Sequence, residues 1–223
     1  MLEKMDDFFN RRLEGYEEHQ LQAIDQARTF YPLTAACLPK EEAARILDLG
    51  CGTGLELGYY FELNPTARVT GIDLARDMLN ALRDKFPHKE LTLVQGSYFD
   101  IPLGHACYDA AVSVESLHHF TQAEKIPLYR KVFEALTADG YFILTDYFAE
   151  SDVQEAFFRQ ELLRLKAEQG LRDGEFYHYD TPLTVEHEIQ ALEQAGFARV
   201  EVLGHWSDTR LLKAVKSPST GNE

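Results

Sequence analysis

Three glycines at alternate positions follow a short apolar run near residue 50. The run is Ile46-Leu47-Asp48-Leu49, the turn is Gly50-Cys51-Gly52-Thr53-Gly54, and a helical pattern follows over residues 55–63. Glycine lacks a Cβ, so such a turn adopts positive φ angles and admits a ligand close to the backbone. The next helix offers unpaired N–H groups at its N-terminus. The pattern predicts a nucleoside cofactor held by Asp48, Gly50, Cys51, Gly52 and Gly54.

A carboxylate at the end of the next predicted strand completes this pattern. Val69-Thr70-Gly71-Ile72 leads to Asp73 and Leu74. An acid about 20 residues beyond the glycines accepts hydrogen bonds from both ribose hydroxyls in adenosine-binding α/β units. The alternative is a surface aspartate that caps the following helix. We predict that Asp73 and Leu74 contact the nucleoside.

The spacing of the glycines and the absence of basic residues narrow the choice of nucleotide. The turn reads Gly-x-Gly-x-Gly rather than Gly-x-Gly-x-x-Gly, and no Lys or Arg lies between Arg45 and Arg68. Nothing in the turn would neutralise a pyrophosphate, whereas S-adenosylmethionine carries a sulfonium and no phosphate. The sequence therefore favours S-adenosylmethionine, and an NAD-dependent oxidoreductase remains the alternative.

From about Ala44 to Lys216 the chain resembles the class I S-adenosylmethionine-dependent methyltransferases. The motifs that carry the resemblance occur in the family's order: ILDLGCGTG, VTGIDLA, VQGSYFDIPL, YDAAVSVESLHHF and LTADGYFILTDY. The third departs from the usual pattern, because Gly96-Ser97 stands where many members have Gly-Asp. The resemblance implies S-adenosylmethionine as cofactor and S-adenosylhomocysteine as product, with Ser97 or Tyr98 at the adenine.

Apolar strand runs alternate with helical patterns from residue 45 onward. Strands are predicted at 45–49, 68–72, 91–95, 109–114 and 141–146, and helices at 55–63, 75–86 and 122–137. Such alternation predicts a parallel sheet covered by helices on both faces. A helix at 184–195, ended by Gly196, precedes strands near 198–203 and 209–215, which form an antiparallel closing hairpin in the resembled family. The fold class is therefore α/β, a Rossmann-like, seven-stranded, mostly parallel sheet with an antiparallel last strand.

We interpret residues 1–223 as one domain in four parts. Residues 1–40 are helical, interrupted at Pro32, and form a lid in the resembled family, although core packing is the alternative. The cofactor-binding core covers 41–150, and 182–216 form the last helix and hairpin. Residues 151–181 are predicted to cover the site with an amphipathic helix and the loop Arg172 to Asp180; its apolar positions are Val153, Phe157, Phe158, Leu162 and Leu165. Lid or substrate contacts are assigned to Tyr16, His19 and Tyr31.

Polar residues at the ends of the fourth and fifth strands are candidates for catalysis. Ligands of open α/β sheets bind beyond the carboxyl ends of the strands. Methyl transfer depends mainly on alignment, and a base is required only for a weak nucleophile. His118 and His119 are candidate bases, or else they pack against the sheet and bond to backbone. Glu115 binds the cofactor or the substrate, or forms a structural pair, and Asp146 and Tyr147 face the same region.

Composition limits the partners and the compartment. The net charge is −15 and Lys and Arg are scattered, which makes free nucleic acid an unlikely partner. No paired cysteine motif is formed by Cys37, Cys51 and Cys107. The segment from Met1 to Asp7 is polar, unlike a secretory signal. No apolar run is long enough to span a membrane. These features predict a cytoplasmic protein, monomeric or homodimeric. Carboxylates near the site are too sparse for a metal, so none is predicted.

The acceptor is predicted to be a small molecule, with three alternatives. No Asn/Asp-Pro-Pro-Tyr/Phe follows the fourth strand, and no cysteine pair suits attack on cytosine C5. One alternative is a tRNA or protein modification enzyme. The C-terminal half, with Ala195-Gly196-Phe197, also resembles carboxy-S-adenosylmethionine synthases, but 174–184 contains no Arg or Lys to hold a carboxylate. The last alternative is a non-catalytic cofactor-binding protein.

Overall fold

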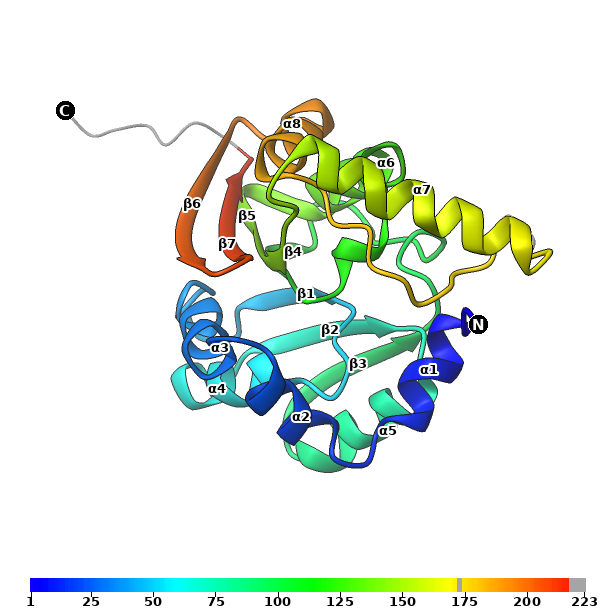
Figure 1. The fold of residues 1–223 in the computed structure, drawn as a ribbon. Coiled ribbons are helices and arrows are strands. Elements are labelled where there is room, and N and C mark those ends of the chain that lie inside the picture. Colours follow the sequence, from blue (N-terminus) through cyan, green and yellow to red (C-terminus); the bar gives the residue numbers. More distant parts are fainter. Residues whose placement is uncertain (172–173, 217–223) are drawn as a thin grey trace.

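A seven-stranded sheet forms the centre of the computed structural model, which describes residues 1–171 and 174–216 (Figure 1). The strands lie in the order β3-β2-β1-β4-β5-β7-β6, and β7 is antiparallel to both neighbours. Their bounds are β1 Arg45–Leu49, β2 Arg68–Asp73, β3 Glu90–Gln95, β4 Tyr108–Val114, β5 Leu136–Tyr147, β6 Arg199–Trp206 and β7 Thr209–Val215. The predicted fold class is confirmed.

Helices cover both faces of this sheet (Figure 1). On one face lie α3 (Ala27–Ala36), α4 (Leu55–Leu63) and α5 (Arg76–Lys85), and on the other lie α6 (Gln122–Ala135) and α8 (Val185–Ala195). Successive strand residues point to opposite faces. Leu47 therefore packs with the α6 and α8 layer, while its neighbour Ile46 packs with the α3 and α4 layer.

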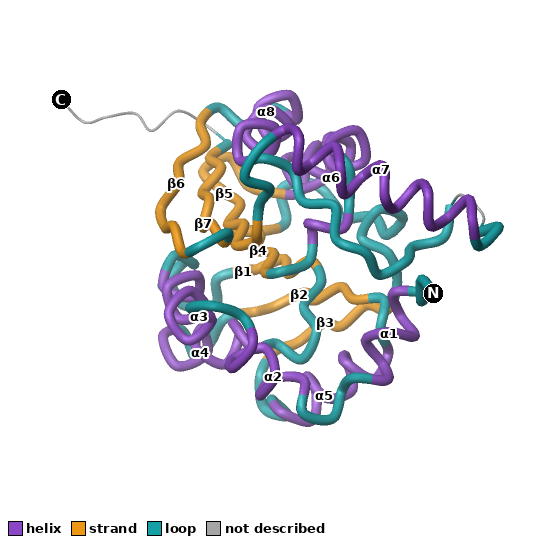
Figure 2. The backbone as a smooth tube through the Cα atoms, in the orientation of Figure 1, coloured by secondary structure: helices purple, strands orange, loops and turns teal. Residues whose placement is uncertain are grey.

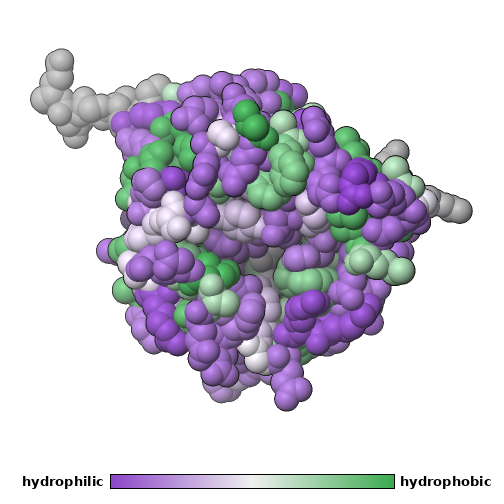
Figure 3. Space-filling view, viewed as in Figure 1, coloured by the Kyte–Doolittle hydropathy of each residue, from purple (hydrophilic) through white to green (hydrophobic). Residues whose placement is uncertain are grey.

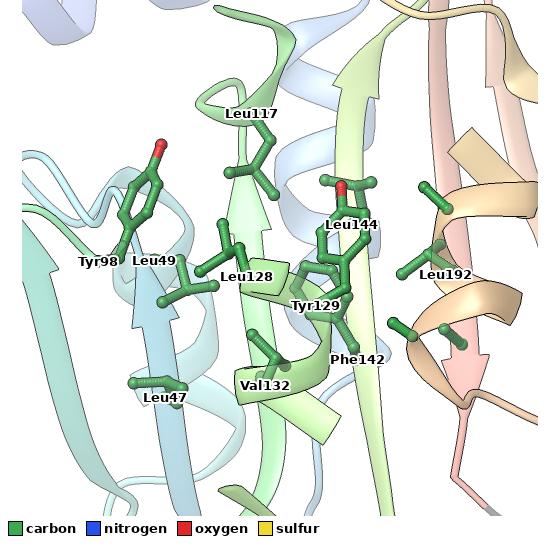
Figure 4. Packing of buried hydrophobic residues seen from close by; sticks show 14 of the residues in the cluster. Leu47, Leu49, Tyr98, Leu117, Leu128, Tyr129, Val132, Phe142, Leu144 and Leu192 are labelled. Carbon is green, nitrogen blue, oxygen red and sulfur yellow. The ribbon is translucent and has the colours of Figure 1, made fainter. Parts of the chain in front are cut away.

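The core between α6 and the sheet is closely packed. Leu128 and Val132 of α6 lie against the central strands, next to Leu49 of β1 and Leu144 of β5 (Figure 4). All four side chains are almost fully buried. Burial of each such side chain stabilises the fold by about 1.5–3 kcal/mol. This layer supports the carboxyl ends of β1, β4 and β5, where the predicted site residues lie.

Two predicted helix boundaries are wrong. Helix α6 ends at Ala135 rather than residue 137, because Leu136 already pairs with Tyr108 of β4 and the chain continues as a strand through Asp139 and Gly140. Pro32 interrupts nothing, since it lies inside α3. A proline has no N–H, so the carbonyl of Arg28, four residues earlier, receives no helical hydrogen bond. Because Arg28 is exposed, water can donate a hydrogen bond to this carbonyl instead.

The first 26 residues form two short helices beside the carboxyl ends of the strands. These are α1 (Met5–Arg11) and α2 (Tyr16–Ala23), joined by a turn that contains Gly15 at φ 72° (Figure 2). Glu17 of α2 accepts a hydrogen bond from Thr53 and pairs with Lys85. The predicted lid segment therefore has two roles: α1 and α2 lie over the site, whereas α3 is part of the sheet-covering layer.

Helix α7 (Asp152–Glu168) lies differently from the prediction. It projects past the body of the molecule (Figure 1), and Val153, Phe157 and Leu163 are 80%, 60% and 60% exposed. Of its predicted apolar positions, Phe158, Leu162 and Leu165 are half-buried on one face, whereas Val153 and Phe157 point to solvent. The loop after it returns to the site, where Lys4 pairs with Tyr177 in an antiparallel bridge. Positions 172 and 173 of the predicted loop lie outside the described residues. None of the described helices has the length and apolarity to cross a membrane.

Candidate active site

The glycine turn keeps an open space above the end of β1. Gly50, Gly52 and Gly54 have φ angles of 75°, 47° and 67°, and Gly54 is the N-cap of α4. A Cβ on Gly50 would collide with the side chain of Ser116, whereas a Cβ on Gly52 would meet no atom within 4 Å. Glycine at 50 is therefore required by the protein's own packing. At position 52 the space is open, as expected where a ligand approaches the backbone.

Asp73, at the end of β2, holds the glycine turn. Its Oδ2 accepts the Gly52 N–H at 2.9 Å, and its Oδ1 accepts the Ala75 N–H at 2.8 Å. Burial raises the pKa of Asp73. Each carboxylate oxygen has a further lone pair, so the side chain can still accept hydrogen bonds from a ribose. The adjacent Leu74 lines the same cleft.

This cleft has a volume of about 50 Å³ and is closed by the N-terminal segment. Gly50, Gly52, Asp73 and Leu74 form its floor, and Met5, Phe9 and Tyr16 cover it. Such a volume is far below the 300–1,000 Å³ typical of a ligand site. We therefore expect α1 and α2 to move outward when a nucleoside enters.

The predicted adenine contacts lie after β3. Tyr98 lines the cleft, and its hydroxyl is 3.3 Å from Ser116 Oγ. Ser97 Oγ accepts the Phe99 N–H within its own turn and leaves its hydroxyl proton available. Sequence reasoning missed Met78 of α5, which also lines this cleft.

Asp48 lies beneath the glycine turn rather than in the cleft. It is buried together with Glu56, and Asp48 Oδ2 and Glu56 Oε1 have no other described hydrogen-bond partner. Burial and the adjacent Glu56 raise the pKa of Asp48 well above its ordinary value. Two buried carboxyls in contact cannot both ionise. Cys51 packs similarly against Gly71, below the surface of the cleft.

Glu115 stands at the end of β4 in a strained conformation. Its φ is 50°, unusual for a residue with a side chain, and its Oε1 is buried without a described partner. Burial and the nearby Asp146 raise the pKa of Glu115 to about 8. An unpartnered buried carboxyl in a strained residue is costly to folding and points to a role in ligand binding.

His118 and Asp146 form a buried pair across β4 and β5. His118 Nδ1 is 2.6 Å from Asp146 Oδ1, while Asp146 Oδ2 accepts the N–H groups of Leu117 at 2.8 Å and His118 at 3.0 Å. Burial lowers the pKa of His118, but the charges of Asp146 and Asp180 outweigh it and raise this pKa to about 10. An imidazole that already holds its proton is a poor base at neutral pH.

His119 and Asp180 meet beside this pair. His119 Nδ1 is 3.2 Å from Asp180 Oδ1, and His118 Nε2 is 3.5 Å from the same oxygen. Burial and the neighbouring His118 lower the pKa of His119, so its imidazole is neutral. Of the two predicted bases, the structure leaves His119 with a free lone pair.

A cavity of about 730 Å³ opens over these groups, on the face that Figure 3 shows hollowed near its centre. His118, His119, Tyr147 and Asp180 lie at its inner end, and Phe8, Arg11, Arg12 and Ile24 line its outer part. Four residues line both this cavity and the cleft at the glycine turn: Phe9, Tyr16, Glu115 and His119. The two spaces are therefore adjacent.

The candidate lid and substrate residues separate into two groups. Tyr16, His19 and Tyr147 line the larger cavity. Tyr31 is buried in the layer of α3, and Asp146 is buried behind His118, so neither lines the two spaces. Sequence reasoning missed His178 and Asp180. The only signal for them was that a polar, aromatic loop follows the inserted helix.

Comparison with known proteins agrees with this geometry. Residues 46–140 match the family model described as a methyltransferase domain. With the fold, this match confirms the resemblance to the class I S-adenosylmethionine-dependent methyltransferases. The chain is 32% identical over 150 residues to a fatty-acid O-methyltransferase from Mycolicibacterium smegmatis. The aligned region covers 63% of this chain and 54% of the relative.

Two further comparisons extend this result. A malonyl-[acyl-carrier protein] O-methyltransferase from Bacillus cytotoxicus is 28% identical over 54% of this chain and 47% of its own length. The chain thus spans about half the length of these two curated relatives. The solved structure of human N-acetylserotonin methyltransferase in complex with S-adenosylmethionine has a TM-score of 0.67, with 13% identity over 96% of this chain and 57% of that chain.

Proposed function

We propose that the protein is an S-adenosylmethionine-dependent methyltransferase that methylates the carboxylate of a small organic acid. The observation that carries this proposal is the junction between the cleft and the larger cavity, which Phe9, Tyr16, Glu115 and His119 line from both sides. One space then holds the cofactor and the other the acceptor. Methyl transfer requires that the two ligands meet end to end, because proximity and alignment supply most of its catalysis.

The residues of the cleft fit the cofactor. S-adenosylmethionine supplies an electrophilic methyl group on a positively charged sulfonium. The open space at Gly52 and the remaining lone pairs of Asp73 suit a ribose, and the unpartnered carboxyl of Glu115 suits a cation. No Lys or Arg belongs to the described lining of the cleft, which disfavours a pyrophosphate cofactor.

The larger cavity offers apolar surface for the tail of an acid. Phe8, Phe9 and Ile24 provide this surface. Arg11 and Arg12, which both pair with Glu3, lie in a lining that also contains the carboxylates of Glu14, Asp25, Glu115, Asp180 and Asp208. Both curated relatives named above are O-methyltransferases, one named for fatty acids. A carboxylate is already ionised at neutral pH, so its methylation needs no general base.

The proposed reaction balances without an added proton carrier. A carboxylate oxygen forms the new O–C bond as the C–S bond breaks, and the electron pair of that bond stays on sulfur. The negative charge of the acceptor and the positive charge of the sulfonium disappear together. Residues around the junction, Tyr16 and Glu115 among them, would exclude water and align the two ligands.

The test is methyl-ester formation. The full chain is incubated with S-adenosylmethionine carrying a labelled methyl group and straight-chain acids of increasing length, and products are identified by mass spectrometry. We expect labelled methyl esters and stabilisation by S-adenosylhomocysteine but not NAD in thermal unfolding. Asp73→Ala should weaken the binding of S-adenosylhomocysteine by about 1.5–3 kcal/mol, the contribution of a charge-assisted hydrogen bond. Stabilisation by NAD alone, or absence of esters across the series, would refute the proposal.

The cytoplasmic location also remains a proposal. Its support is that Cys37, Cys51 and Cys107 are all unpaired, as expected in a reducing compartment. Whether the chain is a monomer or a homodimer stays a prediction.

A further inference from the structure

We propose that His118, His119 and Asp180 bind a divalent transition-metal ion such as Zn²⁺, and that this ion holds the acceptor's carboxylate. The second part rests on the proposed function, whereas the first does not. The sequence predicted no metal, because Asp180 lies more than 60 positions after the histidines and only the folded chain brings the three together.

Distances among the three side chains match those of metal ligands. One donor atom from each lies within 4.8 Å of the others, and Asp180 Oδ1 is 3.5 Å from His118 Nε2 and 3.2 Å from His119 Nδ1. Tetrahedral ligands with bonds of about 2.0–2.1 Å lie about 3.3–3.4 Å apart. The cluster is therefore already close to the size of a coordination shell.

Hydrogen bonding within the cluster is incomplete. Asp180 Oδ1 is buried, and no described donor reaches it with hydrogen-bond geometry, although two imidazole nitrogens are near. In the free protein the imidazolium of His118 compensates this buried oxygen, and a metal ion bound there would replace that proton. A buried carboxylate oxygen that faces two imidazole nitrogens without a well-formed hydrogen bond is the observation that points to an ion between the three groups.

Asp146 prepares His118 as a ligand. Its Oδ1 is 2.6 Å from His118 Nδ1, and an ionised carboxylate only accepts, so Nδ1 donates and Nε2 is left to face Asp180. Metal-binding histidines usually donate their second N–H to a carboxylate in this way. His119 Nδ1 is also 3.2 Å from the carbonyl oxygen of Tyr179, which can only accept, so metal binding through Nδ1 would require its proton to move to Nε2.

The donor set favours some metals over others. Two imidazoles and one carboxylate suit Zn²⁺, Co²⁺ or Fe²⁺, whereas Mg²⁺ prefers oxygen ligands. The three residues all line the 730 Å³ cavity, so a further coordination position faces the space assigned to the acceptor. A carboxylate oxygen bound there would lie next to Glu115 and His119, at the junction with the cofactor cleft.

The first experiment measures metal binding without cofactor or acceptor. The full chain is dialysed against chelator and titrated with Zn²⁺ by calorimetry, with Mg²⁺ for comparison. We expect one Zn²⁺ per chain. Asp146→Asn should weaken its affinity by about 10–100-fold, as for other partners of metal-binding histidines. Asp180→Ala and His119→Ala should weaken it further. Asp180 is 45% exposed, so its variant is expected to fold, which circular dichroism checks.

Two control variants separate this site from other zinc-binding groups. Asp208→Ala removes another carboxylate that lines the same cavity, and His187→Ala removes an imidazole that pairs with Glu155 on the surface. Both should keep the affinity of the parent within about twofold. If His187→Ala abolishes binding while Asp180→Ala does not, or if the parent binds no Zn²⁺, the metal site is refuted.

The second experiment uses Co²⁺ as a coloured probe and octanoate as the carboxylate. Octanoate should change the visible absorption of the Co²⁺ protein if it coordinates the ion, and the change should be absent with octanol. An unchanged spectrum would overturn acceptor binding by the metal. Ester formation at the same rate and with the same KM for acid after chelator treatment would overturn it as well, while leaving the methyltransferase proposal intact.

Discussion

Gly52 is the residue at which a ligand role can best be separated from a packing role. A Cβ there meets no protein atom, so a valine should leave the fold intact apart from the strain of its positive φ, while filling the cofactor's space. We expect Gly52→Val to abolish binding of S-adenosylhomocysteine in calorimetry.

The control for this variant is Gly170→Val. Gly170 also has a positive φ, 61°, and open space around its Cβ position, but it follows α7 and lines neither the cleft nor the larger cavity. Both variants carry a similar backbone cost. Micromolar binding retained by Gly52→Val, or equal loss in both variants, would show that the turn does not hold the cofactor.

His119 is the residue that we predict to act as a general base. Its pKa is lowered by burial and by His118, so it is neutral and can accept a proton from a hydroxyl acceptor. For such an acceptor, His119→Ala should reduce turnover by roughly 10²–10⁴-fold with little change in cofactor affinity.

The same variant distinguishes a base from a metal ligand. If His119 is only a base, the His119→Ala variant should bind Zn²⁺ with unchanged affinity. If His119 is a metal ligand, the variant should bind Zn²⁺ more weakly. His105→Ala, which removes an exposed imidazole that lines neither the cleft nor the larger cavity, is the control. Loss of stability without a specific kinetic effect would mean that His119 only packs against the sheet.

At the scale of elements, a buried charge network joins α6 to α8. Lys125 and Tyr129 of α6 both donate to Glu188 of α8, and Lys125 and Glu188 are 1% and 0% exposed. Removing one partner leaves an uncompensated buried charge. Glu188→Ala should therefore lower the free energy of unfolding by about 3–5 kcal/mol in urea denaturation. Glu193→Ala, on the exposed side of α8, should change it by less than about 0.5 kcal/mol.

The starts of β1 and β4 are joined by a pH-sensitive contact. Arg45 donates to Asp109 from Nη2 at 2.7 Å and from its backbone N–H at 2.8 Å, and these hydrogen bonds lower the pKa of Asp109. Because the folded pKa is lowered, the contact stabilises above the ordinary pKa of about 3.8 and is lost as pH falls through the folded value.

The half-exposed position of this pair keeps its contribution small. Asp109→Asn should reduce the free energy of unfolding by about 0.5–1 kcal/mol at pH 6, and this difference should disappear near pH 2–3. Urea denaturation at both pH values measures it, with Asp139→Asn as the control on an exposed aspartate. A difference that persists at the lower pH would mean that the carboxylate charge is not its cause.

At the scale of the whole molecule, the small cleft requires an opening motion. Met5, Phe9 and Tyr16 cover a space of about 50 Å³ that is too small for a nucleoside. Hydrogen bonds that hold this segment and would break on opening include the one from Met5 N–H to the Phe176 carbonyl at 3.0 Å and the one from Thr53 to Glu17 at 2.6 Å. We expect α1 and α2 to open and close over the cofactor.

Hydrogen exchange tests this motion. Amides of residues 5–23 should exchange faster in the free protein than with S-adenosylhomocysteine, because local opening exposes them. Amides of α6, which packs on the sheet, should exchange equally in both states. Equal protection of residues 5–23 with and without ligand would support the alternative from the sequence, that these aromatic residues are fixed packing contacts.

Local pattern predicted the parallel strands and the positions of the glycine turn and Asp73, whereas the antiparallel closing hairpin came from the family resemblance. Strand, turn and helix are adjacent in the chain around Gly52, and Asp73 follows one helix and one strand later, so periodicity and spacing alone predicted that both lie at one edge of a parallel sheet. The same reasoning placed His118 and Asp146 at the ends of neighbouring strands. Each of these inferences depends on interactions that repeat along the chain, which a sequence displays directly.

Tertiary structure decided what lies opposite those residues. Asp180 reaches the histidines through a loop whose path follows from pairing between residues 3–5 and 176–178, far apart in sequence. Pro32 sits within a helix because packing outweighs one lost hydrogen bond, and Phe157 is exposed because α7 projects from the body. Contacts of this kind depend on the summed packing of distant segments, which no local pattern records, and they determine which charges meet at the acceptor side of the site.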